Sequence, residues 1–372
     1  MTYSIDLNHK CRILYLVGQL GVGGLEQQLV CLLEKEEVKR YLPLVLSWNL
    51  QEGDANFKRI RDLGVKVLAF PPGCGSLTKL AVFARIVSSL RPEVIHSFNF
   101  YTNFPAYFGG KITGAVAIGA LRSDYSTEKK DAGAILGRLC ARWPSVHISN
   151  NQMAVENVKR TGGVFCPQKL VVVRNGLNLL KFKNVTIPLD RTPKILSVGS
   201  LLPVKRWDRL LMAAADLKNK GQEFFMRIVG EGPLRTSLEQ QSLALGLTDQ
   251  VEFLGQRTDV PTLLGESWFL VHTSDREGCP NVVAEAMACG RAVVATDVGD
   301  IPFLVKDGKT GFVVGKEDGK LLSQRMESLI QNVELCRRMG EAGRVMAEKE
   351  FGSDRLVSET LAVYRIAGWE DI

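Results

Sequence analysis

Short apolar runs alternate along the chain with longer stretches in which apolar residues recur every three or four positions. The short runs are bounded by turn-forming residues and predict buried strands, and the longer stretches predict helices that pack on them. Such alternation is typical of parallel sheets covered by helices on both faces. The first series of predicted strands comprises Arg12–Val17, Leu44–Trp48, Val65–Phe70, Val94–Ser97, Ala115–Leu121, Val146–Ser149 and Leu170–Val173. The second comprises Lys194–Val198, Phe225–Val229, Val251–Leu254, Phe269–His272, Ala292–Ala295 and Phe312–Val314.

A polar segment with two prolines, residues 181–193, separates the two series and predicts a domain boundary near residue 185. We therefore expect an N-terminal Rossmann-like domain over residues 1–185 and a C-terminal one over 186–354. A last helix, in residues 355–372, is expected to cross back to the N-terminal domain. A chain of 372 residues suits this division into two α/β domains. Both sheets are predicted to be doubly wound and to face each other across a cleft, with ligands beyond the carboxyl ends of the strands.

Composition narrows the class of protein. Hydrophobic residues make up 45% and charged residues 23% of the chain, which is typical of a globular protein. The 47 Lys and Arg residues against 40 Asp and Glu residues give a net charge of +7, which favours phosphate-bearing ligands or an anionic membrane surface. No helix-turn-helix, RNP or zinc-finger pattern is present, so nucleic acid is not an expected partner.

Cysteine usage and hydropathy suggest where the protein works. No stretch approaches the roughly 18 apolar residues that span a bilayer, and the apolar run of residues 13–17 leads into glycines instead of a cleavage site. The eight cysteines include no C-x-x-C pair, and only four histidines could join them as metal ligands. We therefore expect reduced thiols, no bound metal and a cytoplasmic location.

The first strand leads into a glycine-rich loop, with Gly21, Gly23 and Gly24 before a helical pattern. Such glycines let the backbone approach a phosphate at the start of a helix. A dinucleotide fingerprint would need glycine where Glu26 stands, and the second strand ends without the acidic residue that binds ribose. A nicotinamide-dependent dehydrogenase is therefore disfavoured.

The segment of residues 274–290 carries the most chemistry. A strand ends there in a polar loop, Pro280 stands where the first turn of a helix tolerates proline, and Gly290 closes that helix. Helical side chains lean toward the N-terminus, so Glu285 can reach back toward whatever the first free amides hold. Glu277, on the loop, could address further hydroxyl groups. The two acids could clamp a nucleotide sugar.

The two acids have two other interpretations: they could be solvated or capping glutamates, or they could form a glycosidase dyad. The glycine-rich first loop and a basic loop at Val198–Asp208 both follow strands, so three elements suited to phosphate could meet in one cleft. A hydrolase of plain glycans needs no such cradle, and a nucleotide-sugar site is therefore preferred.

Six short motifs occur in order with compatible spacing. They are Gly23-Gly24-Leu25-Glu26, Asn175-Gly176, Val198-Gly199 through Lys205 to Asp208, Gly230-Glu231-Gly232-Pro233, Phe253-Leu254-Gly255, and Glu277 with seven residues before Glu285. In this order the chain resembles a group 1, family 4 glycosyltransferase of the GT-B fold, over nearly its whole length and most strongly from residue 195 to 315.

The resemblance implies a retaining, metal-independent transfer of a sugar from a nucleotide diphosphate, most simply a UDP-sugar, with no further cofactor. Lys205 would neutralise the leaving diphosphate, Glu285 would hold the ribose, Glu277 the hydroxyls of the sugar, and Arg257 would lie near the base. The implied catalytic residues are Lys205, Glu277 and Arg122. The implied donor-binding residues are Gly23, Gly24, Ser200, Lys205, Arg206, Arg257, Gly278, Cys279, Pro280, Asn281, Val282 and Glu285.

The sequence departs from the family pattern at several positions. Many relatives carry arginine at the position of Ser200 and glycine at that of Arg206, so the second diphosphate cation is either missing or supplied by Arg206. Arg122 stands where relatives often have a histidine that contacts the donor sugar. His96 is either a buried strand-end histidine or, with Asn99, part of the acceptor side.

The acceptor is expected to be a saccharide or a lipid-linked saccharide. The segment Thr127–Trp143 combines apolar residues at helical spacing with basic ones, which suggests either an ordinary crossover helix or peripheral contact with the inner face of a membrane. Two further functions remain open on the same fold: a nucleotide-sugar epimerase and a catalytically silent nucleotide-binding partner.

Overall fold

The chain is divided into two compact units. The computed structural model describes residues 10–21, 23–51, 53–71, 73–188 and 192–371. Unit 1 comprises residues 1–176 and 353–372, and unit 2 comprises residues 177–352. Val22 of the glycine-rich loop and residues 189–191 of the predicted linker lie outside the described residues.

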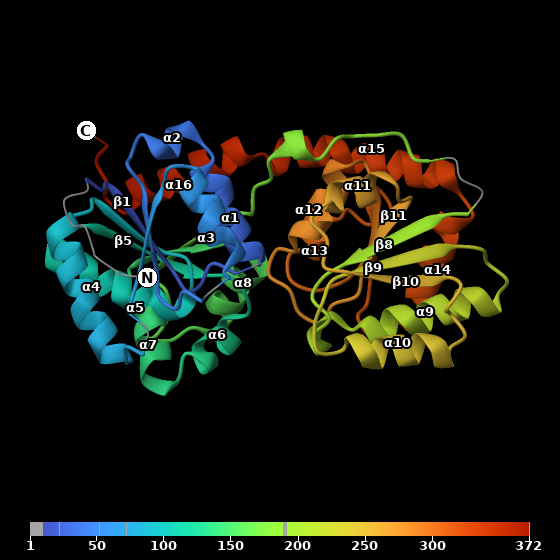
Figure 1. The fold of residues 1–372 in the computed structure, drawn as a ribbon, viewed down its shortest axis with the longest axis horizontal. Helices are drawn as coiled ribbons and strands as arrows, with labels where there is room; N and C mark the ends of the chain where they lie inside the picture. Colours follow the sequence, from blue (N-terminus) through green and yellow to red (C-terminus); the bar gives the residue numbers. More distant parts are fainter. Residues whose placement is uncertain (1–9, 22, 52, 72, 189–191, 372) are drawn as a thin grey trace. The chain divides into compact units, whose positions relative to one another are not determined.

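Unit 1 is built on a seven-stranded parallel sheet in the order β3-β2-β1-β4-β5-β6-β7. Figure 1 labels β1 and β5 of this sheet. Its strands are β1 (Ile13–Val17), β2 (Leu44–Ser47), β3 (Lys66–Ala69), β4 (Val94–Ser97), β5 (Val116–Leu121), β6 (Val146–Ser149) and β7 (Lys169–Val172). Its helices are α1 (Gly24–Leu33), α2 (Glu36–Lys39), α3 (Ala55–Asp62), α4 (Ser76–Leu90), η1 (Phe100–Thr102), α5 (Asn103–Thr113), α6 (Tyr125–Asp131), α7 (Ala134–Arg142), α8 (Gln152–Thr161) and α16 (Ser353–Ile366).

Unit 2 repeats the plan with a six-stranded parallel sheet in the order β10-β9-β8-β11-β12-β13. Its strands are β8 (Lys194–Val198), β9 (Phe225–Val229), β10 (Val251–Gly255), β11 (Phe269–His272), β12 (Ala292–Thr296) and β13 (Gly311–Val314). Its helices are η2 (Leu179–Lys181), η3 (Pro203–Lys205), α9 (Trp207–Asn219), α10 (Arg235–Ala244), α11 (Val260–Gly265), α12 (Asn281–Ala288), α13 (Ile301–Leu304), α14 (Gly319–Ile330) and α15 (Val333–Glu350).

The predicted strands are confirmed, with every end within one residue of its expected position. They were recognisable because both faces of each sheet carry a buried apolar cluster, so the central strands are apolar on both sides. In both sheets the strand order reverses between two neighbours, β1 and β4 in unit 1 and β8 and β11 in unit 2. Loops that leave the carboxyl ends of such neighbours diverge and leave room for a ligand.

The division between the units lies at residue 176, earlier than the expected boundary near residue 185. Leu177 and Phe182 are buried in the apolar cluster of unit 2, and the amide of Leu177 donates to the carbonyl of Phe351 over 2.7 Å. The side chain of Arg291, which is 1% exposed, donates to the carbonyl of Val185 over 2.9 Å. The segment has a polar composition, but its few apolar residues fix it to unit 2.

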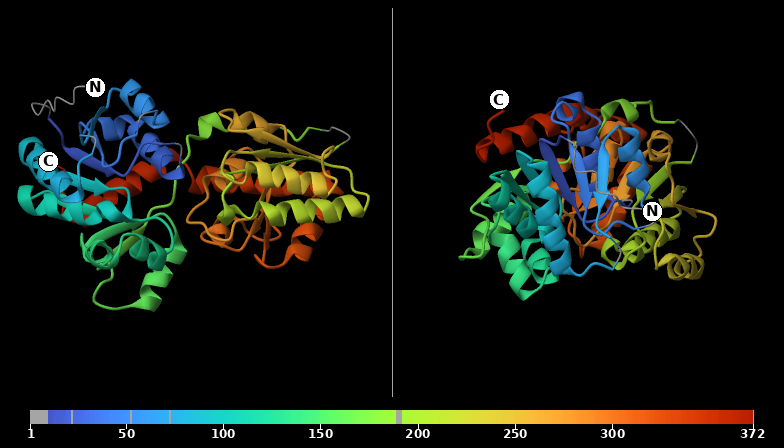
Figure 2. Two further views of the ribbon diagram at one scale, coloured as in Figure 1. Left: turned by 60° about the horizontal axis from the view of Figure 1, so that its bottom comes forward. Right: turned by 60° about the vertical axis from the view of Figure 1, so that its left-hand side comes forward.

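The chain returns to unit 1 at Ser353 and ends in α16, which lies against α1 (Figure 2). Leu361 and Tyr364 of this helix are buried with Ile13 and Tyr15 of β1. Helix α16 therefore covers β1, an inner strand of unit 1, although it follows unit 2 in the sequence.

The segment Thr127–Trp143 forms two helices in place of the single helix that its spacing suggested. Helix α6 ends before Gly133, whose φ of +86° interrupts the helical path, and α7 follows. Helix α7 buries Gly137 and Cys140, whereas Ile135 is 76% exposed. The apolar residues of the segment are therefore divided between the core and the surface.

Candidate functional site

The predicted functional loops leave the strands on either side of the two points where the strand order reverses. In unit 1 the glycine-rich loop follows β1, and Asn99 follows β4. In unit 2 the basic loop follows β8, and the acidic loop, residues 273–280 with Asp275 and Glu277, follows β11. Each pair of loops therefore lies at the carboxyl edge of its sheet, where parallel α/β sheets bind ligands.

Lys205 and Glu277 form an ion pair in unit 2. The Nζ atom of Lys205 lies 2.5 Å from Oε1 of Glu277, and the two side chains are 21% and 13% exposed. The same oxygen accepts a hydrogen bond from Oγ of Ser274 over 2.6 Å and lies 3.0 Å from Nε2 of His272. Burial alone raises the pKa of Glu277, but His272 and Lys205 outweigh it and hold that pKa well below its usual range. Glu277 is therefore ionised throughout the neutral range.

Backbone contacts hold the basic loop against the acidic loop. The hydroxyl of Thr273 donates to the carbonyl of Lys205 over 3.0 Å, and the amide of Asp275 donates to the carbonyl of Val204 over 2.8 Å. Arg209 of α9, 8% exposed, donates to the carbonyl of Thr273 over 2.8 Å and pairs with Asp275. The cation and the carboxylate thus come from loops that are fixed to each other.

Helix α12 begins beside this ion pair. Pro280 is its N-cap residue and not a residue of its first turn, a difference of one position from the expectation. A Cβ on Gly299, whose φ is +53°, would lie 2.4 Å from the carbonyl oxygen of Glu277 and 2.6 Å from that of Gly278. The amide of Asp300 donates to the carbonyl of Gly278 over 2.9 Å. The loop before α12 therefore rests directly on the turn after β12.

Glu285 projects from the middle of α12. Within the described part of the chain its carboxylate has no hydrogen-bond partner, and burial raises its pKa to about 7. A side chain that is only partly buried and lacks a partner can still accept hydrogen bonds from a ligand. Because its pKa lies near neutrality, its charge depends on pH.

Two predicted donor-binding arginines, Arg206 and Arg257, form ion pairs with aspartates. Arg206 lies 2.9 Å from Asp208 and 3.0 Å from Asp275, so its charge is balanced by two carboxylates. Arg257 is exposed and forms a two-pronged pair with Asp259, over 2.9 and 2.7 Å. Lys205 is likewise paired with a carboxylate, but its side chain, at 21% exposed, is less exposed than those of Arg206 and Arg257, at 32% and 42%.

Ser200 lies at the exposed start of the basic loop, and its carbonyl accepts a hydrogen bond from the Trp207 indole over 3.0 Å. Gly230 passes so close to this loop that a Cβ there would lie 1.8 Å from the carbonyl oxygen of Gly199. The glycine motif after β9 therefore packs directly against the backbone of the basic loop.

In unit 1 the glycine-rich loop is held by side chains from other loops. Asn99 accepts a hydrogen bond from the amide of Gly18 over 2.6 Å, and Asp54 accepts one from the amide of Leu20 over 3.0 Å. A Cβ on Gly23 would lie 2.2 Å from a carboxylate oxygen of Glu26. Since like charges repel, a phosphate at Gly23 would require Glu26 to be protonated or to turn away.

Arg122 and His96 form part of a buried cluster in unit 1. Nδ1 of His96 lies 2.7 Å from the hydroxyl of Tyr364, and the histidine is 1% exposed, which favours its structural role over contact with an acceptor. Burial lowers the pKa of Arg122 to about 10, and its guanidinium lies 5.1 Å from the ring centroid of Phe98. Glu128 accepts hydrogen bonds from the amides of Arg122 and Ser123 over 2.9 and 2.6 Å.

His272 and Ser274 hold Glu277 in a way that was not predicted from the sequence. Residues two apart on an extended segment point to the same face, so the pair His272 and Ser274 at the end of a strand was the available signal. Tyr364 gave no such signal, because 268 positions separate it from His96.

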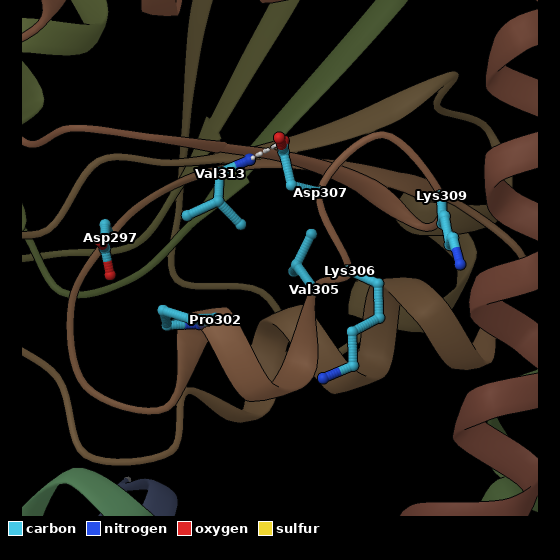
Figure 3. A pocket seen from close by; sticks show the side chains of 7 residues that line it. All are labelled: Asp297, Pro302, Val305, Lys306, Asp307, Lys309 and Val313. Carbon is cyan, nitrogen blue, oxygen red and sulfur yellow. Dashed lines mark hydrogen bonds between the residues drawn. The ribbon is translucent and has the colours of Figure 1, made fainter.

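A shallow hollow of about 490 Å³ lies between α13 and β13 (Figure 3). Its lining residues are Asp297, Pro302, Val305, Lys306, Asp307, Lys309 and Val313. Asp307 already accepts a hydrogen bond from the amide of Val313 over 2.9 Å, and Figure 3 shows Lys309 directed away from the other side chains. We place no ligand in this hollow.

Among the described residues, no three His, Cys, Asp or Glu side chains are grouped so that they could hold a metal ion. Over the same residues, no helix combines the length and apolar character needed to cross a bilayer.

The family model that matches this chain covers most of unit 2. Residues 181–346 match the model of the family glycosyl transferases group 1. The N-acetyl-alpha-D-glucosaminyl L-malate synthase of Bacillus anthracis is 30% identical over 177 residues, covering 47% of this chain and 46% of that protein. The D-inositol 3-phosphate glycosyltransferase of Streptomyces scabiei is 32% identical over 225 residues, covering 54% of this chain and 49% of that protein. The chain thus spans about half the length of the curated relatives it matches.

The fold is also that of solved glycosyltransferase structures. HepE of Anabaena in complex with UDP-glucose has a TM-score of 0.80 and 22% identity, covering 94% of this chain and 99% of that one. Sucrose-phosphate synthase of Thermosynechococcus elongatus has a TM-score of 0.77 and 18% identity, covering 95% and 98%. Residues 181–346 therefore match the model of the family glycosyl transferases group 1, in a chain that has the GT-B fold.

Proposed function

We propose that the chain is a retaining glycosyltransferase that moves a sugar from a nucleotide diphosphate to a saccharide or lipid-linked saccharide acceptor. The observation that carries the proposal is the arrangement in unit 2: a half-buried lysine paired with an ionised glutamate beside the start of α12, and an unpartnered Glu285 within that helix. A cation, a helix start and free acceptor oxygens suit a diphosphate joined to hydroxyl-bearing groups.

Each part of this arrangement has a role in the proposal. Lys205 leaves Glu277 for the diphosphate and stabilises the negative charge that grows there as the sugar departs. Amides in the segment 278–282 hold phosphate oxygens. Glu277 keeps the hydrogen bond from Ser274 and accepts others from the hydroxyls of the sugar, and Glu285 accepts those of the ribose.

The reaction needs no base from the protein in this scheme. The acceptor oxygen forms its bond to the anomeric carbon on the face from which the diphosphate leaves. The bond from that carbon to the phosphate oxygen breaks, and the acceptor proton passes to the departing phosphate. The sugar therefore keeps its configuration. We propose that no metal is required, because Lys205 supplies positive charge at the diphosphate.

The remaining predicted residues take lesser roles. Arg206 orders the basic loop through Asp208 and Asp275 and does not serve as a second diphosphate cation. Arg257 would have to leave Asp259 to reach a base. Arg122, Gly23 and Gly24 belong to unit 1; Arg122 stays a predicted catalytic residue, and the two glycines stay predicted donor-binding residues. Asn99 holds the glycine-rich loop in shape.

A UDP-sugar is the preferred donor, because HepE, which shares the fold, has been solved with UDP and glucose. The acceptor is inferred to belong to glycan biosynthesis, since a similar protein of Escherichia coli is named a colanic acid biosynthesis glycosyltransferase. We infer a cytoplasmic location for the chain, and a lipid-linked acceptor would bring it to the inner face of the membrane.

A thermal-shift screen across nucleotide sugars tests the proposal. At a hundredfold excess over its Kd, the donor is expected to stabilise the protein by about 2.7 kcal/mol, which raises Tm by several degrees. Product analysis with the best ligand then separates three outcomes. Transfer to an added saccharide supports the proposal, release of an isomerised sugar without acceptor indicates an epimerase, and binding without turnover indicates a silent partner. No stabilisation by any nucleotide would contradict the proposal.

His272 is expected to act as a positioning residue for Glu277. His272→Leu removes one hydrogen bond to an ionised carboxylate and should lower kcat/KM at least about tenfold, since such bonds contribute about 1.5–3 kcal/mol. His272→Gln, which keeps a donor near the position of Nε2, should retain most of the activity. Steady-state kinetics of both variants make the comparison, and equal losses would show that the imidazole serves only packing.

A further inference from the structure

Unit 1 exposes large apolar side chains on two segments that are separate in the sequence. On α7, Ile135 is 76% and Leu136 is 37% exposed. In the loop between α8 and β7, Val164 is 78% and Phe165 is 38% exposed. Helices α6, α7 and α8 lie together at one edge of unit 1 (Figure 1). We call these four residues the α7 patch.

Side-chain contacts join the two segments of the α7 patch. The hydroxyl of Tyr125 in α6 donates to the carbonyl of Phe165. The guanidinium of Arg138 in α7 lies 5.7 Å from the ring centroid of Phe165. Arg138 is three positions after Ile135, so the two share one face of α7. The loop and the helix therefore present their apolar residues on one surface.

Helix α7 is also fixed closely to α6. A Cβ on Gly137 would lie 2.1 Å from the carbonyl oxygen of Lys129, so only glycine permits this approach. Gly137 is buried, whereas Ile135 and Leu136, which directly precede it, remain exposed. The exposure of these apolar residues is thus a consequence of how α7 packs against α6.

Basic residues lie on the same segments of the chain as the α7 patch. They are Lys129, Lys130 and Arg138 of the helix pair, and Lys159, Arg160 and Lys169 on either side of the loop; all but the half-buried Lys129 are exposed. The exposed acids of the same segments are Asp131 and Glu156. The patch therefore combines apolar side chains that can enter a lipid layer with an excess of cations that can meet anionic headgroups.

We propose that the α7 patch docks the chain on an anionic lipid surface. Ile135, Leu136, Val164 and Phe165 enter the boundary between headgroups and acyl chains, and the cations on the same segments contact the headgroups. A second copy of the chain is the less suitable occupant, because self-association of this surface would bring like charges together. The proposal depends only on unit 1 and does not require glycosyl transfer.

Vesicle flotation tests the proposal without measuring activity. The full chain is mixed with vesicles of phosphatidylcholine and phosphatidylglycerol at 3:1, and with vesicles of phosphatidylcholine alone. We expect binding to the anionic vesicles that weakens as salt is raised, because salt screens exposed charges. Binding that is equal on both vesicles, or absent from both, would overturn the proposal.

Two matched pairs of variants locate the binding surface. Ile135→Ser with Val164→Ser should weaken partitioning roughly tenfold for each side chain, whereas Leu77→Ser, at a site on α4 that is 85% exposed, should leave it unchanged. Replacing Lys130, Arg138 and Lys159 by glutamine should weaken partitioning about fivefold for each charge. The same replacement of the exposed Lys58, Arg61 and Arg85 elsewhere on unit 1 should have little effect.

Folding and self-association are checked on the same variants. Unchanged thermal melting shows that a loss of binding does not come from unfolding. Equal losses in the patch variants and in their controls would show that the α7 patch is not the docking surface. A dimer that depends on Ile135 and Val164, with no vesicle binding, would assign the patch to a second copy and contradict the proposal.

Discussion

Lys205→Ala is expected to lower kcat/KM at least about a hundredfold. In the proposed reaction the lysine faces charge that develops on the leaving diphosphate, and removing one such stabilising group from a water-poor site costs about 2.7–4 kcal/mol. Steady-state kinetics with the donor found in the thermal-shift screen measure this loss. Glu277 keeps its hydrogen bond to Ser274 in the variant, so the loop before α12 should remain ordered.

A second lysine of unit 2 serves as the control. Lys220 is also paired with carboxylates, lying 2.8 Å from Asp216 and 3.1 Å from Glu327, but it follows α9 and stands outside the proposed site. Lys220→Ala should leave kcat/KM unchanged. If Lys205→Ala retained near-normal turnover, the diphosphate would have to bind elsewhere.

Glu285→Ala is expected to cut kcat/KM by at least about a hundredfold, because the carboxylate no longer accepts hydrogen bonds from the ribose. The same variant should not lose stability. Burial raises the pKa of Glu285 to about 7, above its value in the unfolded chain, so ionisation of this group costs folding free energy as the pH rises from about 4.5 through 7. Above pH 7 the alanine variant should therefore melt at the same temperature as the parent or at a higher one.

The pH dependence of nucleotide binding gives a separate test of Glu285. The ionised carboxylate is the better acceptor, so affinity for the nucleotide should rise as the pH increases through about 7. Calorimetric titrations at several pH values measure this rise. Glu285→Gln should bind more weakly and lose the rise near pH 7, and a variant that kept it would show that another group controls the titration.

The strands were predictable because each central strand is apolar on both faces, so the hydrophobic pattern itself marks them. The boundary near residue 185 was not, because two buried residues, Leu177 and Phe182, decide to which unit the segment belongs. The helix expected over residues 127–143 is interrupted at Gly133, which has a positive φ. This interruption could not be predicted, because a single glycine inside an amphipathic pattern can also be helical.

In the candidate site, too, features set by neighbouring residues in the sequence were predictable, and features set by contacts between distant segments were not. The spacing of Glu277 and Glu285 indicated an acidic pair around a helix start, because both lie within one strand, loop and helix. The spacing of the motifs did not predict two features: the ion pair of Arg206 with Asp275, and the lack of a hydrogen-bond partner for Glu285 among the described residues. Both depend on which side chains other elements bring near, and only the folded chain supplies that information.

The place of α16 in the chain affects how unit 1 is completed during synthesis. All of unit 2 is made between the two parts of unit 1, which at about 5–20 residues per second takes roughly 10–35 seconds on the ribosome. Throughout that interval the side of β1 that carries Ile13 and Tyr15 lacks the helix that buries it. Unit 2, which is continuous, can close first, so the part of the protein translated earliest is the last to finish folding.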